Sequence, residues 1–426
     1  MSGRTWRVGV AGLGTVGGEL VRLIGERPDF APSGERIELV GVSARRRNLS
    51  REAGATWFDD PVALATCPDV DLFVELIGGA EGPARAAVTA ALQAGKPVVT
   101  ANKALIAAHG LELARLAESQ GAALLFEAAV MGGAPAVKLV REAVVGCRTL
   151  HLAGILNGTC NFILTEMEAS GRDFAEVLAE AQARGFAEAD PTTDVGGFDA
   201  AHKIAILAAL AFDAAPNLHA AEIDGITGVE LIDIRLAGVL GYRIKLIAEA
   251  ERSGEGARVR VAPALVPLAH PLAQAGGALN ALFVEGERTG RLFLQGSGAG
   301  AGPTAAAVAA DIADVVAGVR RPVFQRPAAE LAPLPAGGDQ ARTGASYIRL
   351  MVHDRPGVLA AVTEALAKAG VSIDSLLQRP VQPGGLVPIV LTTQQAPESA
   401  VQEAVGHMAE MDAMAEPVRS IRIARI

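Results

Sequence analysis

The chain has 426 residues, enough for two or three domains, and half of it is hydrophobic. A net charge of -9 does not favour nucleic acid, whose binding domains usually carry a basic face. Three cysteines without paired spacing argue against a disulfide framework or zinc site, and the apolar run 204–212 is too short for a bilayer. With no signal peptide before the first expected strand, we expect a cytoplasmic protein.

The first expected strand, residues 7–11, runs into a glycine-rich turn and then a helix at 19–25. This is the GxGxxG pattern in its strand–turn–helix setting, where glycines allow close approach to a pyrophosphate at the helix N-terminus. It predicts a dinucleotide site; the alternative is a turn without a ligand. The candidate cofactor-binding residues are Gly12, Leu13, Gly14, Thr15, Val16 and Gly17.

The next strand, residues 37–42, predicts the cofactor type. An NAD site usually has a carboxylate near the end of this strand, but here the chain reads Arg45-Arg46-Arg47. Guanidinium groups bind a 2′-phosphate in bidentate fashion, so the sequence favours NADP, with Arg45 as its ligand. NAD stays possible, since some of these arginines simply solvate a loop.

Strands at 70–77 and 97–100, with a helix at 83–93 between them, continue the β/α alternation and predict a doubly wound sheet. Ligands bind beyond the carboxyl ends of such strands, where Lys103 follows Asn102. Lys103 is therefore a candidate functional residue; the alternative is a surface lysine at a helix N-terminus. Farther on, Asn157 and Thr159 form a polar turn after a strand and suit either substrate contacts or helix capping by Thr159 or Asn161.

The segment from Gly185 to Lys203 gathers carboxylates among glycines and runs into a buried helix. Asp199 and Lys203 are four residues apart and so share one helix face. Together with Glu188 they would surround the helix entrance and suit a small ammonium group. Asp190 and Asp194 are interpreted as mainly structural, Asp190 forming a turn that Asp194 caps. A solvated loop with an intrahelical ion pair is the alternative.

Strands at 246–251 and 257–263 predict a mixed sheet, and the glycine turn 295–302 leads into a helix ending near 319. Residues 326–345 have the Pro, Gly and Ala content of a linker. From 346 onward the pattern reads βαββαβ, typical of a ferredoxin-like fold.

Several motifs carry a family resemblance: Ala-Asn-Lys103, Asn157-Gly-Thr-x-Asn161, and Asp190-Pro-x2-Asp194 with Asp199-x3-Lys203. In this order they resemble the homoserine dehydrogenases, and the segment Asp354-Arg-Pro-Gly357 onward resembles an ACT domain. The resemblance implies interconversion of L-homoserine and L-aspartate 4-semialdehyde with NADP or NAD, in threonine, methionine and isoleucine biosynthesis. Rival interpretations are another amino-acid dehydrogenase with a Rossmann domain, or a catalytically inactive amino-acid sensor.

The resemblance also implies roles for individual residues. Lys203, Lys103 and Asp199 would be catalytic, with the acid–base lysine left open, and Lys103 would lie beside the cofactor. Substrate would be bound by Glu188, Asp199, Lys203, Asn157 and Thr159. The turn with Gly300 and Gly302 would approach the cofactor. A monovalent cation, sodium by expectation, would be held by Glu127 and the carbonyls of Val130, Gly132 and Ala134.

We therefore expect an α/β Rossmann domain (1–135 plus about 300–325), an α+β substrate and dimerisation domain (136–299), a linker (326–345) and an ACT domain (346–426). The ACT turn with Asp354 and Gly357 is expected to bind an amino-acid effector, threonine by family norm; the alternative is an ACT domain that serves dimerisation without sensing. A homodimer or homotetramer is expected, with no membrane or nucleic-acid partner.

Overall fold

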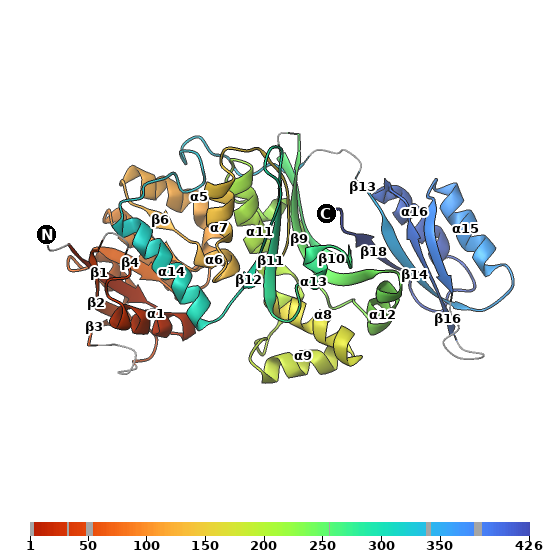
Figure 1. Cartoon of the computed structure of the whole chain (residues 1–426), viewed down its shortest axis with the longest axis horizontal. Coiled ribbons are helices and arrows are strands. Elements are labelled where there is room, and N and C mark those ends of the chain that lie inside the picture. Colours follow the sequence, from red (N-terminus) through yellow and green to blue (C-terminus); the bar gives the residue numbers. More distant parts are fainter. Residues whose placement is uncertain (1–3, 32–33, 48–53, 255, 338–341, 379–385) are drawn as a thin grey trace.

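The computed structural model describes residues 4–31, 34–47, 54–254, 256–337, 342–378 and 386–426. Three units follow one another along the molecule (Figure 1): a first domain around one parallel sheet, a central domain, and a C-terminal domain. The C-terminus itself lies between the central and C-terminal domains. No helix in the described part of the chain combines the length and apolar character needed to cross a membrane.

The first domain contains a six-stranded sheet in which every pairing is parallel, in the order β3-β2-β1-β4-β5-β6. Because β1 and β4 are covered on both faces, their sequences are nearly continuous apolar runs. The strand order reverses between β1 and β4, which is where such sheets bind ligands. The predicted Rossmann-like sheet is confirmed. Its strands are β1 (Thr5–Ala11), β2 (Arg36–Ser43), β3 (Thr56–Phe58), β4 (Leu72–Glu75), β5 (Val98–Thr100) and β6 (Leu124–Leu125).

Helices cover both faces of this sheet, and one of them comes from far along the chain. Helix α14 (Ala301–Val316) packs against α1, and its Val308 and Ile312 share a hydrophobic core with Val8 and Leu20. The chain thus leaves the first domain, builds the central domain and returns (Figure 1). The other helices are α1 (Thr15–Glu26), α3 (Pro61–Thr66), α4 (Pro83–Gln93) and α5 (Lys103–Ser119).

The central domain has a mostly antiparallel sheet, with helices α8 and α11 packed against it. Its strands are β7 (Thr149–Ile155), β8 (Ala221–Ile223), β9 (Tyr242–Ser253), β10 (Gly256–Pro267), β11 (Leu279–Gly286) and β12 (Gly290–Ser297). Its helices are α6 (Ala128–Met131), α7 (Ala136–Lys138), a π-helical turn (Leu139–Ala143), α8 (Gly158–Ser170), α9 (Phe174–Ala183), α10 (Thr192–Val195), α11 (Phe198–Ala211), a 3-10 turn (Leu218–Ala220), α12 (Leu231–Val239) and α13 (Pro271–Gln274).

The C-terminal domain has the predicted βαββαβ order, with its strands side by side as β18-β14-β16-β15. Its apolar helix stripes, including Val362, Leu366 and Val401, pack on the sheet around Leu350. The elements are β13 (Thr343–Gly344), β14 (Ser346–His353), α15 (Val358–Lys368), β15 (Ile373–Gln378), β16 (Leu386–Thr393), β17 (Ala396–Pro397), α16 (Glu398–Ala409) and β18 (Arg419–Ile423).

The central and C-terminal sheets are continuous, because β18 pairs in parallel with β10 at Ala264 and Leu265. A buried ion pair strengthens this junction. Arg349 of β14 donates from Nε and Nη2 to the fully buried carboxylate of Asp233 on α12, at 2.7 and 3.3 Å. Removing one partner from such a pair leaves a buried charge uncompensated, so the pair constrains how the two domains dock.

The connection between α14 and β14 is fastened to both preceding domains over its first part. Ala328 donates its N–H to Glu118 of α5 at 2.7 Å, and its carbonyl accepts from Arg115 at 3.2 Å. Farther along, Gly337 donates to the Ala257 carbonyl of β10 at 2.8 Å. The segment predicted to be a linker therefore lies along the first and central domains; residues 338–341 are outside the described part of the chain.

Glycines in the fingerprint turn allow backbone contacts that no other residue permits. A Cβ on Gly17 would lie 1.8 Å from the Gly12 carbonyl oxygen, and one on Gly12 would lie 2.3 Å from the Leu76 carbonyl oxygen. The turn is thereby held against the loop that follows β4.

We predict that Gly17→Ala destabilises the first domain by about 3 kcal/mol and weakens dinucleotide binding, because its methyl group overlaps the turn backbone. The matched control is Gly25→Ala, in the same helix with open space around its Cβ. It should be neutral or stabilise by up to about 1 kcal/mol. Thermal unfolding and cofactor titration measure both; equal behaviour of the two variants would contradict the packing role.

Candidate functional site

The carboxyl ends of β4 and β5 are joined by a buried polar network. Glu75 accepts the N–H groups of Ile77 and Gly78 at 2.7 and 2.9 Å, and the Thr100 hydroxyl donates to its other oxygen at 2.5 Å. Asn102 donates from its side chain to the Gly79 carbonyl at 2.7 Å. The loop that touches Gly12 is thus fixed to the residue immediately before Lys103.

At the junction of the first and central domains, one carboxylate holds two lysines. Asn102 caps α5 through its Oδ1, which starts the helix at Lys103. The Lys103 Nζ lies 2.9 Å from Oδ1 of Asp199, and the Lys203 Nζ lies 2.9 Å from Oδ2. Lys203 also donates to the Leu156 carbonyl at 2.7 Å. The predicted proximity of Asp199 and Lys203 on one helix face holds, and Lys103 reaches them from another domain.

Burial separates the proton affinities of the two lysines. Burial lowers the pKa of Lys203, and the neighbouring Lys103 charge adds to this, so the pKa stays below the ordinary value despite Asp199. Burial also lowers the pKa of Lys103, but attraction to Asp199 outweighs it and the net pKa is raised. For Asp199, burial raises the pKa, yet the Lys203 and Lys103 charges hold it well below its usual range.

Asn157 occupies the end of the turn after β7 and orients two acids. Its Oδ1 caps α8 by accepting the Cys160 N–H, while its Nδ2 donates to Asp194 and Asp199, each at 2.8 Å. The interpretation of Asp194 as a cap for the Asp190 turn is wrong: its carboxylate faces Asn157, and burial raises its pKa. The turn is closed instead by Asp190, which accepts from Thr192 N–H and hydroxyl. Helix capping in this motif falls to Asn157, not to Thr159 or Asn161.

The remaining predicted substrate residues lie at the rim of this site. Glu188 is exposed, and its charge helps to raise the pKa of Lys103, which places it on the open side of the lysine pair. The Thr159 hydroxyl donates to the Phe186 carbonyl at 2.7 Å, which ties the carboxylate segment to α8. The site is therefore deeply buried at Lys203 and open toward Glu188.

The predicted cofactor residues line the first domain near the start of α1. Gly14 precedes α1, and a Cβ there would meet nothing within 4 Å, so there is space beside the turn at this position. Arg45 is exposed just beyond β2. Gly300 caps α14 with φ +115°, a conformation that L side chains rarely adopt, and Gly302 lies in that helix's first turn. The fingerprint turn and the end of β2 lie together, because the Gly12 N–H donates to the Ser43 carbonyl at 2.8 Å.

Comparison with known proteins decides the family. Models of the homoserine dehydrogenase NAD-binding domain, of homoserine dehydrogenase itself and of the ACT domain match residues 12–127, 135–313 and 346–406. A homoserine dehydrogenase from Pseudomonas aeruginosa is 40% identical, with 99% of each chain covered. The chain belongs to the homoserine dehydrogenase family.

Solved structures of homoserine dehydrogenases share all or most of the fold. One from Thiobacillus denitrificans is 40% identical with a TM-score of 0.91, covering 100% of this chain and 99% of that one. A hyperthermophilic archaeal homoserine dehydrogenase in complex with NADPH is 25% identical with a TM-score of 0.65, covering 75% and 99%. The family consists of NAD(P)-dependent oxidoreductases, so membership favours the dehydrogenase interpretation over the inactive sensor.

In this family member, Glu127 stands beside a second buried acid that sequence reasoning missed. The Glu127 carboxylate accepts the N–H groups of Val137 and Lys138 at 2.9 and 2.8 Å, and its own N–H donates to Asp311 of α14 at 2.8 Å. Burial raises the pKa of Glu127, and it raises that of Asp311 to about 7. Oδ1 of Asp311 has no hydrogen-bond partner among the described residues.

The backbone groups predicted to share a cation with Glu127 do not all lie in one glycine-rich loop. Val130 belongs to α6, Gly132 follows it with φ +53°, and the Ala134 carbonyl accepts the Ala136 N–H at 2.7 Å. A Cβ on Gly132 would lie 2.8 Å from the Gly298 carbonyl, so this turn packs against the segment leading into α14.

Asn280 is a further site residue that sequence reasoning missed. It is fully buried at the start of β11, and its Nδ2 donates to the Leu156 carbonyl at 3.0 Å, the same oxygen that accepts from Lys203. A Cβ on Gly298 would lie 2.1 Å from the Asn280 Cγ, so that glycine makes room for the amide. A single asparagine in an apolar strand carries no local signal for such a role.

The ACT turn of the C-terminal domain is exposed throughout. Asp354 lies in the loop between β14 and α15, and Gly357 is the residue before α15 with φ +92°. A left-handed residue at this position requires glycine, so the tight turn itself is fixed by sequence.

Proposed function

We propose that this chain interconverts L-aspartate 4-semialdehyde and L-homoserine with NADP(H), or with NAD(H), in the biosynthesis of threonine, methionine and isoleucine. The observation that carries this proposal is the Asp199 carboxylate, 2.9 Å from both Lys103 and Lys203 at the junction of the dinucleotide fold and the central domain. An alcohol reaching this junction meets one lysine suited to accept a proton and another that stays charged.

The first domain fits a dinucleotide. Glycines at positions 12, 14 and 17 let backbone approach closely, and the α1 N-terminus presents N–H groups to an anion. Three exposed arginines beyond β2, with no carboxylate in the loop 44–47, support a preference for the 2′-phosphate of NADP, led by Arg45. The archaeal relative whose structure holds NADPH agrees with this preference.

The acid-lined opening suits the ammonium end of homoserine, with Glu188 and Asp199 as its partners. Asn157 acts by orienting Asp194 and Asp199, since both hydrogen atoms of its amide are used there. Thr159 acts through the segment that carries Glu188. Charge complementarity therefore selects a substrate that carries a positive group at one end.

Lys203 is the proton acceptor and donor in this proposal, because its pKa is lowered whereas that of Lys103 is raised. Neutral Lys203 takes the hydroxyl proton as the alcohol carbon becomes an aldehyde, and returns it in the reverse direction. Bound oxidised nicotinamide supplies the acceptor for the hydride that leaves that carbon. Charged Lys103 stabilises the negative charge that develops on the substrate oxygen. It also lowers the pKa of Lys203, so that a larger fraction of Lys203 is neutral.

A monovalent cation, sodium by expectation, completes the proposal near Glu127. Two buried carboxyl groups, Glu127 and Asp311, lie together, and burial raises the pKa of each. A cation bound beside them would stabilise their ionised forms. Carbonyls of Val130, Gly132 and Ala134 would supply hard oxygen ligands. The ion would brace the turn that packs against the entry to α14.

The ACT domain is proposed to bind an amino-acid effector, threonine in the first instance, at the turn with Asp354 and Gly357. Its support is the family match together with the exposed, glycine-fixed turn. We also propose a homodimer or homotetramer working in the cytoplasm, as the family resemblance implies.

We predict that Lys203→Ala reduces kcat for homoserine oxidation by at least about 10³-fold while the Kd of NADP⁺ stays within twofold, since the lysine acts on the proton and not on the nucleotide. Lys96→Ala, which removes a part-buried lysine of the first domain far from Asp199, is the control and should retain turnover. Full activity of Lys203→Ala would refute the proton-transfer role.

The pH profile distinguishes Lys203 from Lys103. kcat/KM for homoserine oxidation should rise with pH as Lys203 loses its proton, with its midpoint below the usual lysine pKa of about 10.4. The Asp194 charge raises the Lys203 pKa, so Asp194→Asn should move the rising limb to lower pH. Asp190→Asn, at an exposed turn, should not move it. A midpoint above the usual lysine pKa would assign the limb to Lys103, whose pKa is raised, and an upward shift in Asp194→Asn would contradict an assignment to either lysine.

Arg45→Ala should raise the KM of NADP⁺ about tenfold and leave that of NAD⁺ unchanged, because only NADP⁺ carries the 2′-phosphate that a charge-assisted bond would hold. Arg47→Ala is the matched control, since the Arg47 guanidinium lies 5.5 Å from the Trp57 ring centroid. Initial rates with each nucleotide decide the matter. A parallel loss with both nucleotides would show that Arg45 supports the loop instead.

A further inference from the structure

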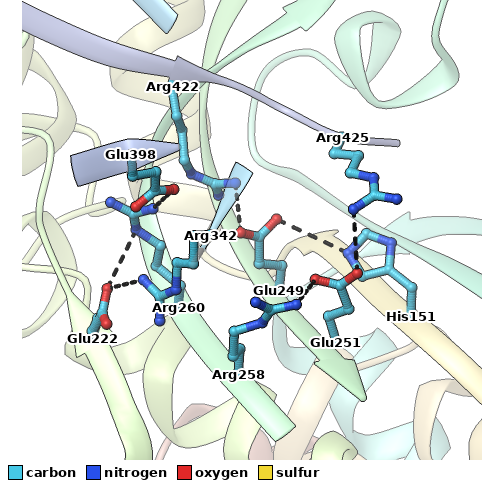
Figure 2. A network of polar contacts seen from close by, with 10 residues as sticks. All are labelled: His151, Glu222, Glu249, Glu251, Arg258, Arg260, Arg342, Glu398, Arg422 and Arg425. Carbon is cyan, nitrogen blue, oxygen red and sulfur yellow. Dashed lines mark hydrogen bonds and ion pairs between the residues drawn. The ribbon is translucent and has the colours of Figure 1, made fainter. Parts of the chain in front are cut away.

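A large cavity lies between the central sheet and the C-terminal domain, away from the Asp199 site. It has a volume of about 910 Å³, within the size range of small-molecule sites. Arg258 and Arg260 of β10 contribute from the central domain, whereas Glu398 of α16 and Arg422 of β18 contribute from the C-terminal domain (Figure 2).

Strand alternation places this cavity on the opposite face of the sheet from helix α11, which carries Asp199 and Lys203. Ala248 and Ala250 of β9 belong to the core that includes Ile204 of α11, whereas the intervening Glu249 and Glu251 line the cavity. Successive residues of a strand point to opposite faces, so no side chain of β9 serves both sites.

The lining is rich in arginine, although the whole chain has a net charge of -9. The eight lining arginines outnumber the four lining glutamates, and burial lowers the pKa of His151, which keeps that residue neutral. These arginines are Arg148, Arg252, Arg258, Arg260, Arg291, Arg342, Arg422 and Arg425; the glutamates are Glu249, Glu251, Glu285 and Glu398.

Some of these arginines form ion pairs with the glutamates that line the cavity. Glu249 accepts from Arg422 at 2.6 Å, Glu251 from Arg258 at 3.2 Å, and Glu398 from Arg260 at 2.9 Å (Figure 2). Glu251 also lies 3.7 Å from Arg425, and Glu285 pairs with Arg291 at 3.5 Å. Glu222, beside the lining residues, pairs with Arg342 (Figure 2). Eight arginines thus meet five carboxylates, so a smaller surplus of positive charge remains.

Within this surplus, the buried Arg422 lacks acceptors. Arg422 is only 12% exposed, and its Nε and Nη2 have no hydrogen-bond partner among the described residues. Arg148 and Arg252 also have no carboxylate within 4.0 Å among the described residues, but they are less enclosed: Arg148 is exposed, and Arg252 donates to the Thr149 and Ala211 carbonyls at 3.4 and 3.5 Å. Buried donors are normally satisfied, so Arg422 lacks an acceptor that an anion in the cavity would supply.

We propose that this cavity binds a small polyanion, a phosphate-bearing or polycarboxylate metabolite, that joins the C-terminal domain to the central sheet. Planar guanidinium groups from both domains would hold its anionic groups in bidentate fashion. The ligand would strengthen a junction now made by the short β10–β18 pairing and the Asp233–Arg349 ion pair. The site is distinct from the ACT turn at Gly357 and does not rest on the proposed reaction.

Calorimetric titration of the full chain tests the proposal, with NADP⁺ in saturating amount so that its pyrophosphate site is filled. Pyrophosphate and citrate are titrated separately. Binding of pyrophosphate alone identifies a phosphate-bearing ligand, and binding of citrate alone a polycarboxylate; binding of both supports the shared chemistry. Absence of binding by either overturns the proposal.

Variants locate the bound anion. Arg148→Gln/Arg425→Gln removes one exposed arginine from each domain, and Arg422→Lys keeps the charge beside Glu249 but removes the unpartnered donors. Each should weaken binding about tenfold, whereas Arg27→Gln, an exposed arginine at the end of α1, should not. If Arg422→Lys fails to fold, anion affinity is measured on the double variant alone. Unchanged affinity in the double variant overturns the proposal.

A second copy of this chain is the competing occupant of the cavity. Sedimentation analysis of the double variant decides between them: a lower mass, together with no anion binding by the unmodified chain, would show a subunit interface and sink the proposal. Hydrogen exchange gives an independent readout, because a bridging ligand should slow exchange at the β18 amides in the unmodified chain and not in the double variant. Equal exchange in both despite binding would overturn the bridging role.

Discussion

One buried carboxylate, Asp199, is shared by lysines from two domains, and the rest of the site depends on this sharing. Lys203 reaches it from the same helix, and Lys103 reaches it from the start of α5. A buried anion is tolerated when charges and hydrogen bonds surround it, and here Asn157 supplies the additional donor. The two ion pairs fix the position of the dinucleotide-binding domain relative to the central domain. Hydride transfer requires such a fixed geometry, because its rate depends on the distance between cofactor and substrate.

One charge cluster gives the two lysines different proton affinities. Lys203 is enclosed, so its charged form loses hydration and its pKa falls; Lys103 is more open, keeps its charge and lowers the pKa of Lys203 further. Divergent pKa values in neighbouring groups are typical of acid–base centres, and they support the proton-transfer role proposed for Lys203. The Asp194 charge opposes the fall in the Lys203 pKa, while Asp194 and Glu188 both help to raise that of Lys103. The proton affinity of each lysine therefore depends on several neighbouring charges and on no single contact.

The C-terminal domain is coupled to the catalytic part through backbone and not through a loose tether. Its edge strand β18 continues the central sheet, Arg349 is buried against Asp233, and the preceding connection is bonded to α5 at Glu118. Because β9 and β10 contact α11 on one face and line the arginine-rich cavity on the other, a ligand at the cavity and a substrate near Asp199 act on the same strands. A change in how the C-terminal domain docks would therefore act on β9 and β10, which contact the helix that carries Lys203.

Sequence alone determined what depends on local pattern. The strand periodicity, the fingerprint glycines, the i, i+4 spacing of Asp199 and Lys203 and the βαββαβ order are properties of short segments, and each was visible there. Tertiary structure alone decided which polar groups are buried together. Asp194 turned to Asn157 instead of capping a turn, Asp311 met Glu127 across the chain, and arginines distant in sequence came to line one cavity. Such choices follow from burial, because a charge's partner is fixed by the folded neighbourhood and not by its place along the chain.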